Sequence, residues 1–222
     1  MAVIPRYLVE TGPGAVETAF RHTPSLCAKH GITSVTLVVP GKQRFESSLV
    51  ANFLGEAYVK ALLKGKSVPL VQGLPMVLES PATLSPNLAP GLIVGAHISD
   101  KAMAKIDDAR NAKAILYIPW NETEGREWQA TWHPTTIGPA TWSASAATLP
   151  SEVEDELMRL TQLINLGTGL NHPSDKAHAR RAIAALKAAG HSLDPAEIKR
   201  WARRHRWSSH AAAELETIAK KS

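Results

Sequence analysis

The sequence contains a single cysteine, Cys27, among its 222 residues, so an internal disulfide is excluded. The first residues lack the cationic segment, apolar stretch and small-residue cleavage site of a secretory signal peptide. No apolar run approaches the roughly 20 residues that a membrane-spanning helix requires. From these absences we expect a soluble protein of the reducing cytoplasm, with no membrane partner.

Signatures of several common chemistries are also missing. The nine histidines form no His-Glu-x-x-His pair and have no cysteine partner set, so we expect no metal site. No Gly-x-Ser-x-Gly motif is present, which argues against a standard serine hydrolase. Cys27 falls on the packing face of a predicted helix, where a thiol behaves as a small apolar group. The sequence leaves open whether the chain is an enzyme and which cofactor it uses.

Short apolar runs alternate with segments of helical period over the first 120 residues, a pattern typical of a parallel sheet with helices packed on it. The predicted strands are Arg6–Thr11, Ser34–Val39, Val68–Val71 with a continuation at Pro75–Leu78, Leu92–His97 and Ala112–Ile118. Most are continuously apolar, as expected of strands covered on both faces. The predicted fold class is α/β: an open, mainly parallel, Rossmann-like or flavodoxin-like sheet of about five strands with flanking helices.

The helices predicted between these strands differ in how clearly they are marked. Pro24 should interrupt a helix over 15–30, since proline removes a backbone hydrogen bond. Apolar residues recur at helical spacing from Arg44 to Lys64, which predicts one long helix that ends at Gly65. Further helices are expected over 99–110 and over 121–132. The proline-rich segment 80–91 is predicted to be a surface loop.

The last third of the chain predicts a small helical subdomain. We expect an α/β domain over residues 1–142, a linker over 143–150 and a basic helical subdomain over 151–222, with helices near 153–164, 174–189, 194–206 and 209–220. From His172 onward the chain has 11 Lys and Arg against 5 Asp and Glu, whereas residues 1–171 have 14 against 15. This excess of positive charge suggests an anionic partner.

Candidate ligand-binding residues follow the predicted strands, because ligands of parallel α/β sheets bind beyond the carboxyl ends of the strands. The candidates are Gly12, Gly14, Lys42, Arg44, His97, Asp100, Asn121 and Glu124. The glycines precede a helix and could present backbone N–H groups to an anion, and the two cations could contact a phosphate. We therefore expect a small anionic ligand of nucleotide or phosphate type, although such glycines also simply form turns.

Two other segments allow alternative functions. Four of the six tryptophans lie between Trp120 and Trp142; they could stack on a base or anchor a partner, but we favour packing over the end of the sheet. Near the C-terminus, one predicted helix turns a basic face toward solvent, which consists of Lys199, Arg200, Arg203 and Arg204, with Arg206 following. With the next helix it outlines a helix-turn-helix, and this suggests a nucleic-acid-binding or protein-interaction module.

The electrostatics argue against the nucleic-acid alternative. The second helix of a helix-turn-helix enters the major groove, yet here that helix contains Glu214 and Glu216 and has no cation before Lys220. Nucleic acid is therefore a less favoured partner than a small anionic ligand. The sequence does not decide whether the chain forms a homo-oligomer.

Overall fold

A computed structural model of the chain describes residues 4–71, 73–85, 90–109, 111–139, 141–142 and 149–221. The chain divides into two compact units, each with its own core. The α/β unit comprises Met1–Gln129 and His133–Ala144, and the helical unit comprises Ala130–Trp132 and Ser145–Ser222. The linker expected over 143–150 lies mostly outside the described residues, since the description resumes only at Leu149.

The α/β unit contains a mixed, mostly parallel sheet, so the predicted fold class is confirmed at this level. Its seven strands have the order β3-β4-β2-β5-β6-β1-β7. Their bounds are Arg6–Val9 (β1), Val35–Val38 (β2), Val68–Val71 (β3), Leu74–Glu79 (β4), Gly91–Ala96 (β5), Ala112–Ile118 (β6) and Thr135–Ile137 (β7). Among the strands that the structure describes, β3 alone runs antiparallel to its neighbour, β4. This order differs from those of the dinucleotide-binding and flavodoxin sheets.

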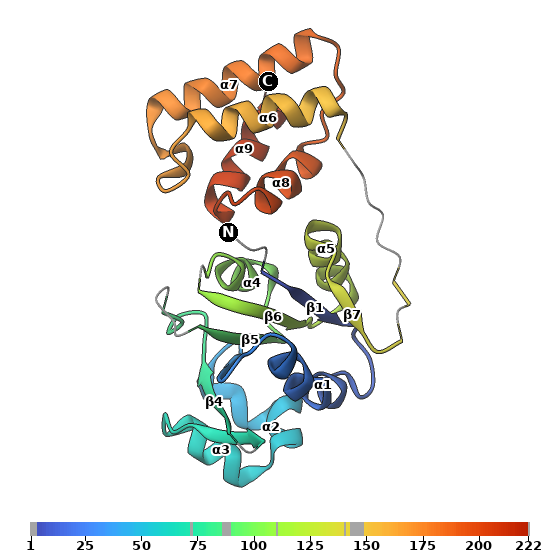
Figure 1. Cartoon of the computed structure of the whole chain (residues 1–222), viewed down its shortest axis with the longest axis vertical. Coiled ribbons are helices and arrows are strands. Elements are labelled where there is room, and N and C mark those ends of the chain that lie inside the picture. The colour runs from blue at the N-terminus through green and yellow to red at the C-terminus, as the bar shows by residue number, and fades with distance from the viewer. Residues whose placement is uncertain are drawn as a thin grey trace. The chain divides into compact units, whose positions relative to one another are not determined.

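Helices cover both faces of this sheet (Figure 1). One face packs against α1 (Ala15–Lys29), the 3₁₀ helix η1 (Lys42–Ser47), α2 (Leu49–Leu54) and α3 (Glu56–Leu63), which share a continuous apolar core with the strands. The other face packs against α4 (Asp100–Asp107) and α5 (Glu122–Trp132). Gly95 of β5 faces Met103 and Ile106 of α4, for example, and the Tyr117 ring of β6 meets the Trp128 ring of α5 at 5.3 Å.

Several sequence predictions about these elements were wrong. The single long helix expected over 44–64 is three separate helices, η1, α2 and α3. Ser48 caps the start of α2, and Gly55, with φ 84°, interrupts the helix between α2 and α3. Pro24 lies inside the continuous helix α1, since proline removes one hydrogen bond there without ending the helix. The sheet has seven strands instead of about five: β4 is a strand of its own, and β7 lies between the helix expected over 121–132 and the linker expected over 143–150, where no strand was predicted.

The connections leaving β2 and β5 diverge. From β2 the chain continues to β3 and β4 on one side of the sheet order, whereas from β5 it passes through α4 to β6 on the other. In an open α/β sheet this divergence separates the connecting segments and leaves a crevice beyond the carboxyl ends of the two strands. The segments that begin at Val39 and at His97 border this point.

The helical unit consists of α6 (Ser151–Leu163), the 3₁₀ helix η2 (Gly169–Asn171), α7 (Pro173–Ala188), α8 (Pro195–Arg204) and α9 (Ser209–Lys221). Its core is built from apolar residues of α6, α7, α8 and α9, including Leu157, Trp201 and Trp207. Side chains cap two of these helices: Asp194 accepts from the Ala196 N–H at 2.9 Å and Ser208 from the Ala211 N–H at 3.2 Å. No helix among the described residues is long and apolar enough to cross a membrane.

Cys27 is buried in α1, and burial raises the pKa of its thiol to about 11. The neutral thiol therefore predominates at about pH 8, and it reacts far more slowly than a thiolate. We expect no fast reaction of the native protein with Ellman's reagent at this pH and complete reaction in denaturant. Fast labelling of the native protein would contradict the buried position of Cys27.

Candidate functional site

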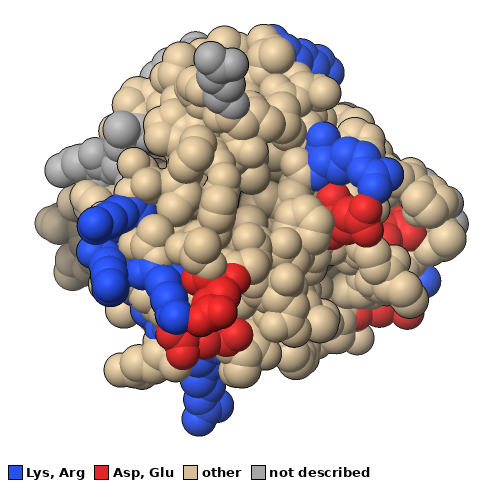
Figure 2. Space-filling model, turned by 90° about the horizontal axis from the view of Figure 1, so that it is seen from below, with Lys and Arg blue, Asp and Glu red and all other residues tan. Residues whose placement is uncertain are grey.

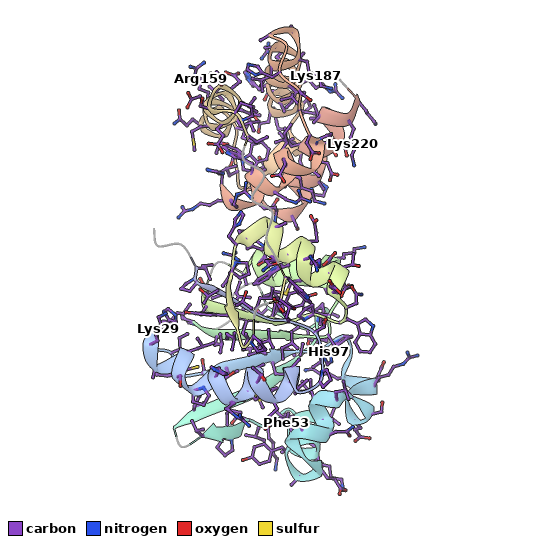
Figure 3. The ribbon with its side chains drawn as sticks, turned by 90° about the vertical axis from the view of Figure 1, so that its right-hand side faces the viewer. Lys29, Phe53, His97, Arg159, Lys187 and Lys220 are labelled. Carbon is purple, nitrogen blue, oxygen red and sulfur yellow. The ribbon has the colours of Figure 1, made fainter. Side chains whose placement is uncertain are left out.

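His97 lies directly after β5, beside the point where the connections diverge. In Figure 3 it lies at one end of the sheet, and Lys29, at the C-terminus of α1, lies at the other. Its backbone N–H donates to the Ile118 carbonyl at 2.8 Å, which joins the ends of β5 and β6. Four of the predicted ligand-binding residues, His97, Asp100, Asn121 and Glu124, follow these two neighbouring strands. Together with Trp120 they form what we call the β5–β6 site.

The backbone of His97 has φ 54°, a left-handed conformation that is costly for a residue with a side chain. Strained residues of this kind concentrate at functional sites, where the surrounding structure holds them in place. Its ring is half-buried, and burial lowers the pKa of the imidazole. A neutral ring at pH 7 can both donate and accept a hydrogen bond.

Trp120 is the large aromatic side chain of this site, and it is 66% exposed. Its ring meets the His97 ring edge to face, with the ring centres 5.4 Å apart and the planes at 81°. By contrast, Trp128 and Trp142 are buried. The expectation that the tryptophans of this segment pack against the protein therefore agrees with these two and is wrong for Trp120. An exposed indole at the end of a strand is a stacking surface for a planar ring.

Three further polar residues belong to β6 or to the segment that follows it. Asn121 caps α5, since its side-chain oxygen accepts from the Glu124 N–H at 2.9 Å. Glu124 places its Oε2 atom in a buried position where no described residue donates to it. The Tyr117 hydroxyl donates to the Ile98 carbonyl at 3.0 Å. Burial raises the pKa of Tyr117, and the charges of Glu124, Asp100 and Asp107 raise it further.

Lys42 follows β2, the strand next to β5, and already has an anionic partner. Its Nζ is 3.2 Å from Oε2 of Glu79, the last residue of β4. Thr83 also donates to the same carboxylate oxygen. Arg44 is an exposed residue of η1. Glu79 was not among the predicted site residues. A carboxylate at the end of the apolar run Leu74–Leu78 becomes visible as a candidate once β4 is recognised as a separate strand.

Gly12 and Gly14 follow β1, which is separated from β5 by β6. Both have positive φ, and a side chain added at either would meet no atom within 4 Å. The nearby Glu10 carboxylate is occupied: it accepts from the backbone N–H groups of Thr141 and Trp142 and from the Thr141 hydroxyl. Burial opposes ionisation of Glu10, but these hydrogen bonds lower its pKa overall. The glycines therefore border a different part of the sheet edge from His97.

The predicted basic face of α8 is largely engaged within the helical unit. Arg203 is buried, and its Nη1 donates to the Trp207 carbonyl at 2.9 Å. Lys199 pairs with Glu216 at 3.3 Å and Arg200 with Glu197 at 2.5 Å. The expectation that these side chains face solvent is therefore wrong for Arg203, while Lys199, Arg200 and Arg204 are half-buried.

Arg206 is the exposed member of the predicted basic set. It lies in the turn between α8 and α9 with φ 70°, at the position where glycine is common in helix-turn-helix motifs. The structure thus pairs a helix-turn-helix outline with an α9 whose two carboxylates, Glu214 and Glu216, are bound to Lys176 and Lys199.

Basic residues form no continuous patch on the visible part of the face of the α/β unit that carries α2 and α3. Figure 2 shows Lys and Arg in separate groups there, with Asp and Glu beside some of them. On α3, Lys60 pairs with Glu56. The described residues of this face therefore form no continuous positive stripe of the kind by which proteins bind a nucleic-acid backbone.

Comparison with known proteins adds one finding. The family model of a domain of unknown function, DUF1889, matches residues 151–222, which contain α6 to α9. No curated protein and no solved structure matches the chain. The similarity is thus confined to the helical unit and carries no statement about the β5–β6 site.

Proposed function

We propose that the α/β unit binds a small ligand of nucleoside or nucleotide type at the β5–β6 site. The observation that carries the proposal is the exposed Trp120 indole, held beside the strained His97 at the carboxyl end of neighbouring strands. A purine or pyrimidine base would stack on this indole, an interaction worth about 1–3 kcal/mol for bases on aromatic side chains.

The polar groups of the site suit the rest of such a ligand. The carboxylates of Asp100 and Glu124 accept hydrogen bonds, and the buried Glu124 Oε2 would gain a donor from a ribose hydroxyl or a base amino group. A phosphate placed beside these carboxylates would be repelled. Any phosphate group should therefore point across β2, toward Lys42 and Arg44, where Lys42 would exchange its contact with Glu79 for the ligand.

The test is a calorimetric titration with adenosine, AMP and inorganic phosphate. We expect adenosine and AMP to bind and Trp120→Leu to weaken both by about tenfold or more, since stacking is lost. Phe53→Leu is the matched control, because Phe53 is an exposed aromatic of α2 whose ring packs on Phe20 and which is not a residue of the β5–β6 site. It should leave affinity unchanged.

Lys42→Ala separates the two parts of the ligand. It should weaken AMP and leave adenosine unaffected if Lys42 contacts phosphate. Failure of the wild-type protein to bind any nucleoside, or equal binding by Trp120→Leu, would overturn the proposal. Binding of phosphate alone, insensitive to Trp120, would return the assignment to a simple anion site.

A further inference from the structure

The helical unit has a surface groove between α7 and α9, far along the chain from the β5–β6 site. Its volume is about 440 Å³, and its lining residues are Lys176, Arg180, Ala184, Glu214, Thr217, Ile218 and Lys221. In Figure 3, Lys187 of α7 and Lys220 of α9 lie on one side of this unit and Arg159 of α6 lies on the other. Lys187 joins the two groove helices, since its Nζ donates to the Ala219 carbonyl at 2.8 Å.

Positive charge exceeds negative charge in this groove. Lys176 pairs with Glu214, and this hydrogen bond lowers the pKa of the Glu214 carboxyl. Arg180 and Lys221 are exposed and form no ion pair with any described residue. Lys221 also lies near enough to Glu214 for its charge to lower the pKa of that carboxyl. The lining therefore holds three cations against one carboxylate, and this excess of positive charge would attract an acidic ligand.

The groove also offers an apolar contact. Ile218 belongs to the core of the unit and still reaches the groove, and Ala184 is exposed on the facing side of α7. A nucleic-acid backbone presents mainly anionic phosphates, which gain little from an apolar contact and would also approach Glu214. An amphipathic peptide helix, by contrast, presents carboxylates and an apolar side chain on the same face at spacings of three and four residues.

We propose that the α7–α9 groove binds an acidic amphipathic helix of a protein partner. Its carboxylates pair with Arg180 and Lys221, and an apolar side chain between them rests on Ile218. The family model matches this unit and none of the α/β unit, which agrees with a module that has its own recognition surface. The proposal is independent of the nucleoside site.

The experiment is selection of a displayed library of helical peptides against the full chain. We expect enriched sequences that combine Asp or Glu with a Leu or Ile at helical spacing. A synthetic, fluorescein-labelled copy of the leading peptide is then titrated with the protein by fluorescence anisotropy. Arg180→Glu combined with Lys221→Glu should weaken binding by about tenfold or more, since like charges replace the pairs.

Lys64→Glu combined with Lys66→Glu is the matched control, because it makes the same charge change on exposed residues of the α/β unit. This variant should bind the peptide as the wild type does, and circular dichroism should show both variants folded. Enrichment of peptides without acidic residues, or equal binding by the Arg180 and Lys221 variant, would overturn the proposal. Self-association of the chain in light scattering, with a second copy displacing the peptide from the groove, would also overturn the proposal. Preferential binding of duplex DNA would do the same.

Discussion

Asp107→Ala is expected to destabilise the α/β unit by about 3–5 kcal/mol, the usual cost of removing one partner of a buried ion pair. The side chain of Asp107 at the end of α4 is 4% exposed and that of Arg6 in β1 is 8% exposed, with Nε and Oδ1 3.2 Å apart. The other carboxylate oxygen accepts from the Trp128 indole N–H at 3.0 Å. Alanine would leave a buried guanidinium and a buried N–H without this acceptor.

The loss is large beside the 5–15 kcal/mol that stabilises an ordinary domain, so much of the variant should be unfolded at moderate urea concentrations. Urea denaturation followed by circular dichroism measures it. Asp107→Asn keeps an acceptor for the Trp128 N–H, so its effect on the free energy of unfolding reports the loss of the charge alone. The double variant Arg6→Met with Asp107→Leu replaces the whole ion pair by apolar side chains and should recover part of the lost stability. As a control, Glu17→Gln in the exposed pair with Arg21 should change stability little. A small effect of Asp107→Ala would show that water or another group compensates Arg6.

Gly125→Ala is expected to destabilise the same unit by about 1–3 kcal/mol, the usual cost of overpacking. A Cβ atom at Gly125 would lie 2.2 Å and 2.5 Å from ring atoms of Trp142 and 2.9 Å from Pro119. Trp142 is buried, and its backbone N–H is held by Glu10 at 2.9 Å, so the ring has little freedom to withdraw. The clash outweighs the gain of about 1 kcal/mol that alanine has over glycine inside a helix.

The sign of this effect should reverse when the ring is removed. In a Trp142→Leu background, Gly125→Ala should be neutral or stabilising, since only its helix propensity remains. The double-mutant cycle, read from thermal unfolding, isolates the contact between the two positions. Additive effects would mean that the indole moves aside without cost.

Local sequence signals predicted the central strands well and the edges of the sheet poorly. β2, β5 and β6 are largely apolar along their length because both faces of each strand are covered. β7 has only three residues, Thr135–Ile137, and follows His133 in a left-handed conformation, so it has no pattern long enough to recognise. Helical spacing of apolar residues continues across Gly55 and therefore concealed the break between α2 and α3.

The candidate site was predicted in part, since polar residues after strands are visible in sequence. Which of them meet depends on strand order, a long-range property that no local pattern records. The order brings His97 and Glu124 to neighbouring strand ends and leaves Gly12 and Gly14 beyond β6. Partners distant in sequence were equally hidden: Lys42 meets Glu79, and Arg203 is buried against the turn before α9.

The position of β1 in the sheet has a consequence for synthesis of the chain. The first strand pairs with β6 and β7. Its hydrogen bonds can form only after Ile115, the partner of Arg6, and Thr135, the partner of Tyr7, have been synthesised. At about 5–20 residues per second, that wait on a ribosome is on the order of ten seconds. In this interval four strands can already pair with one another: β3, β4, β2 and β5. The apolar strand β1 remains unpaired meanwhile, and chaperones can bind it or it can aggregate.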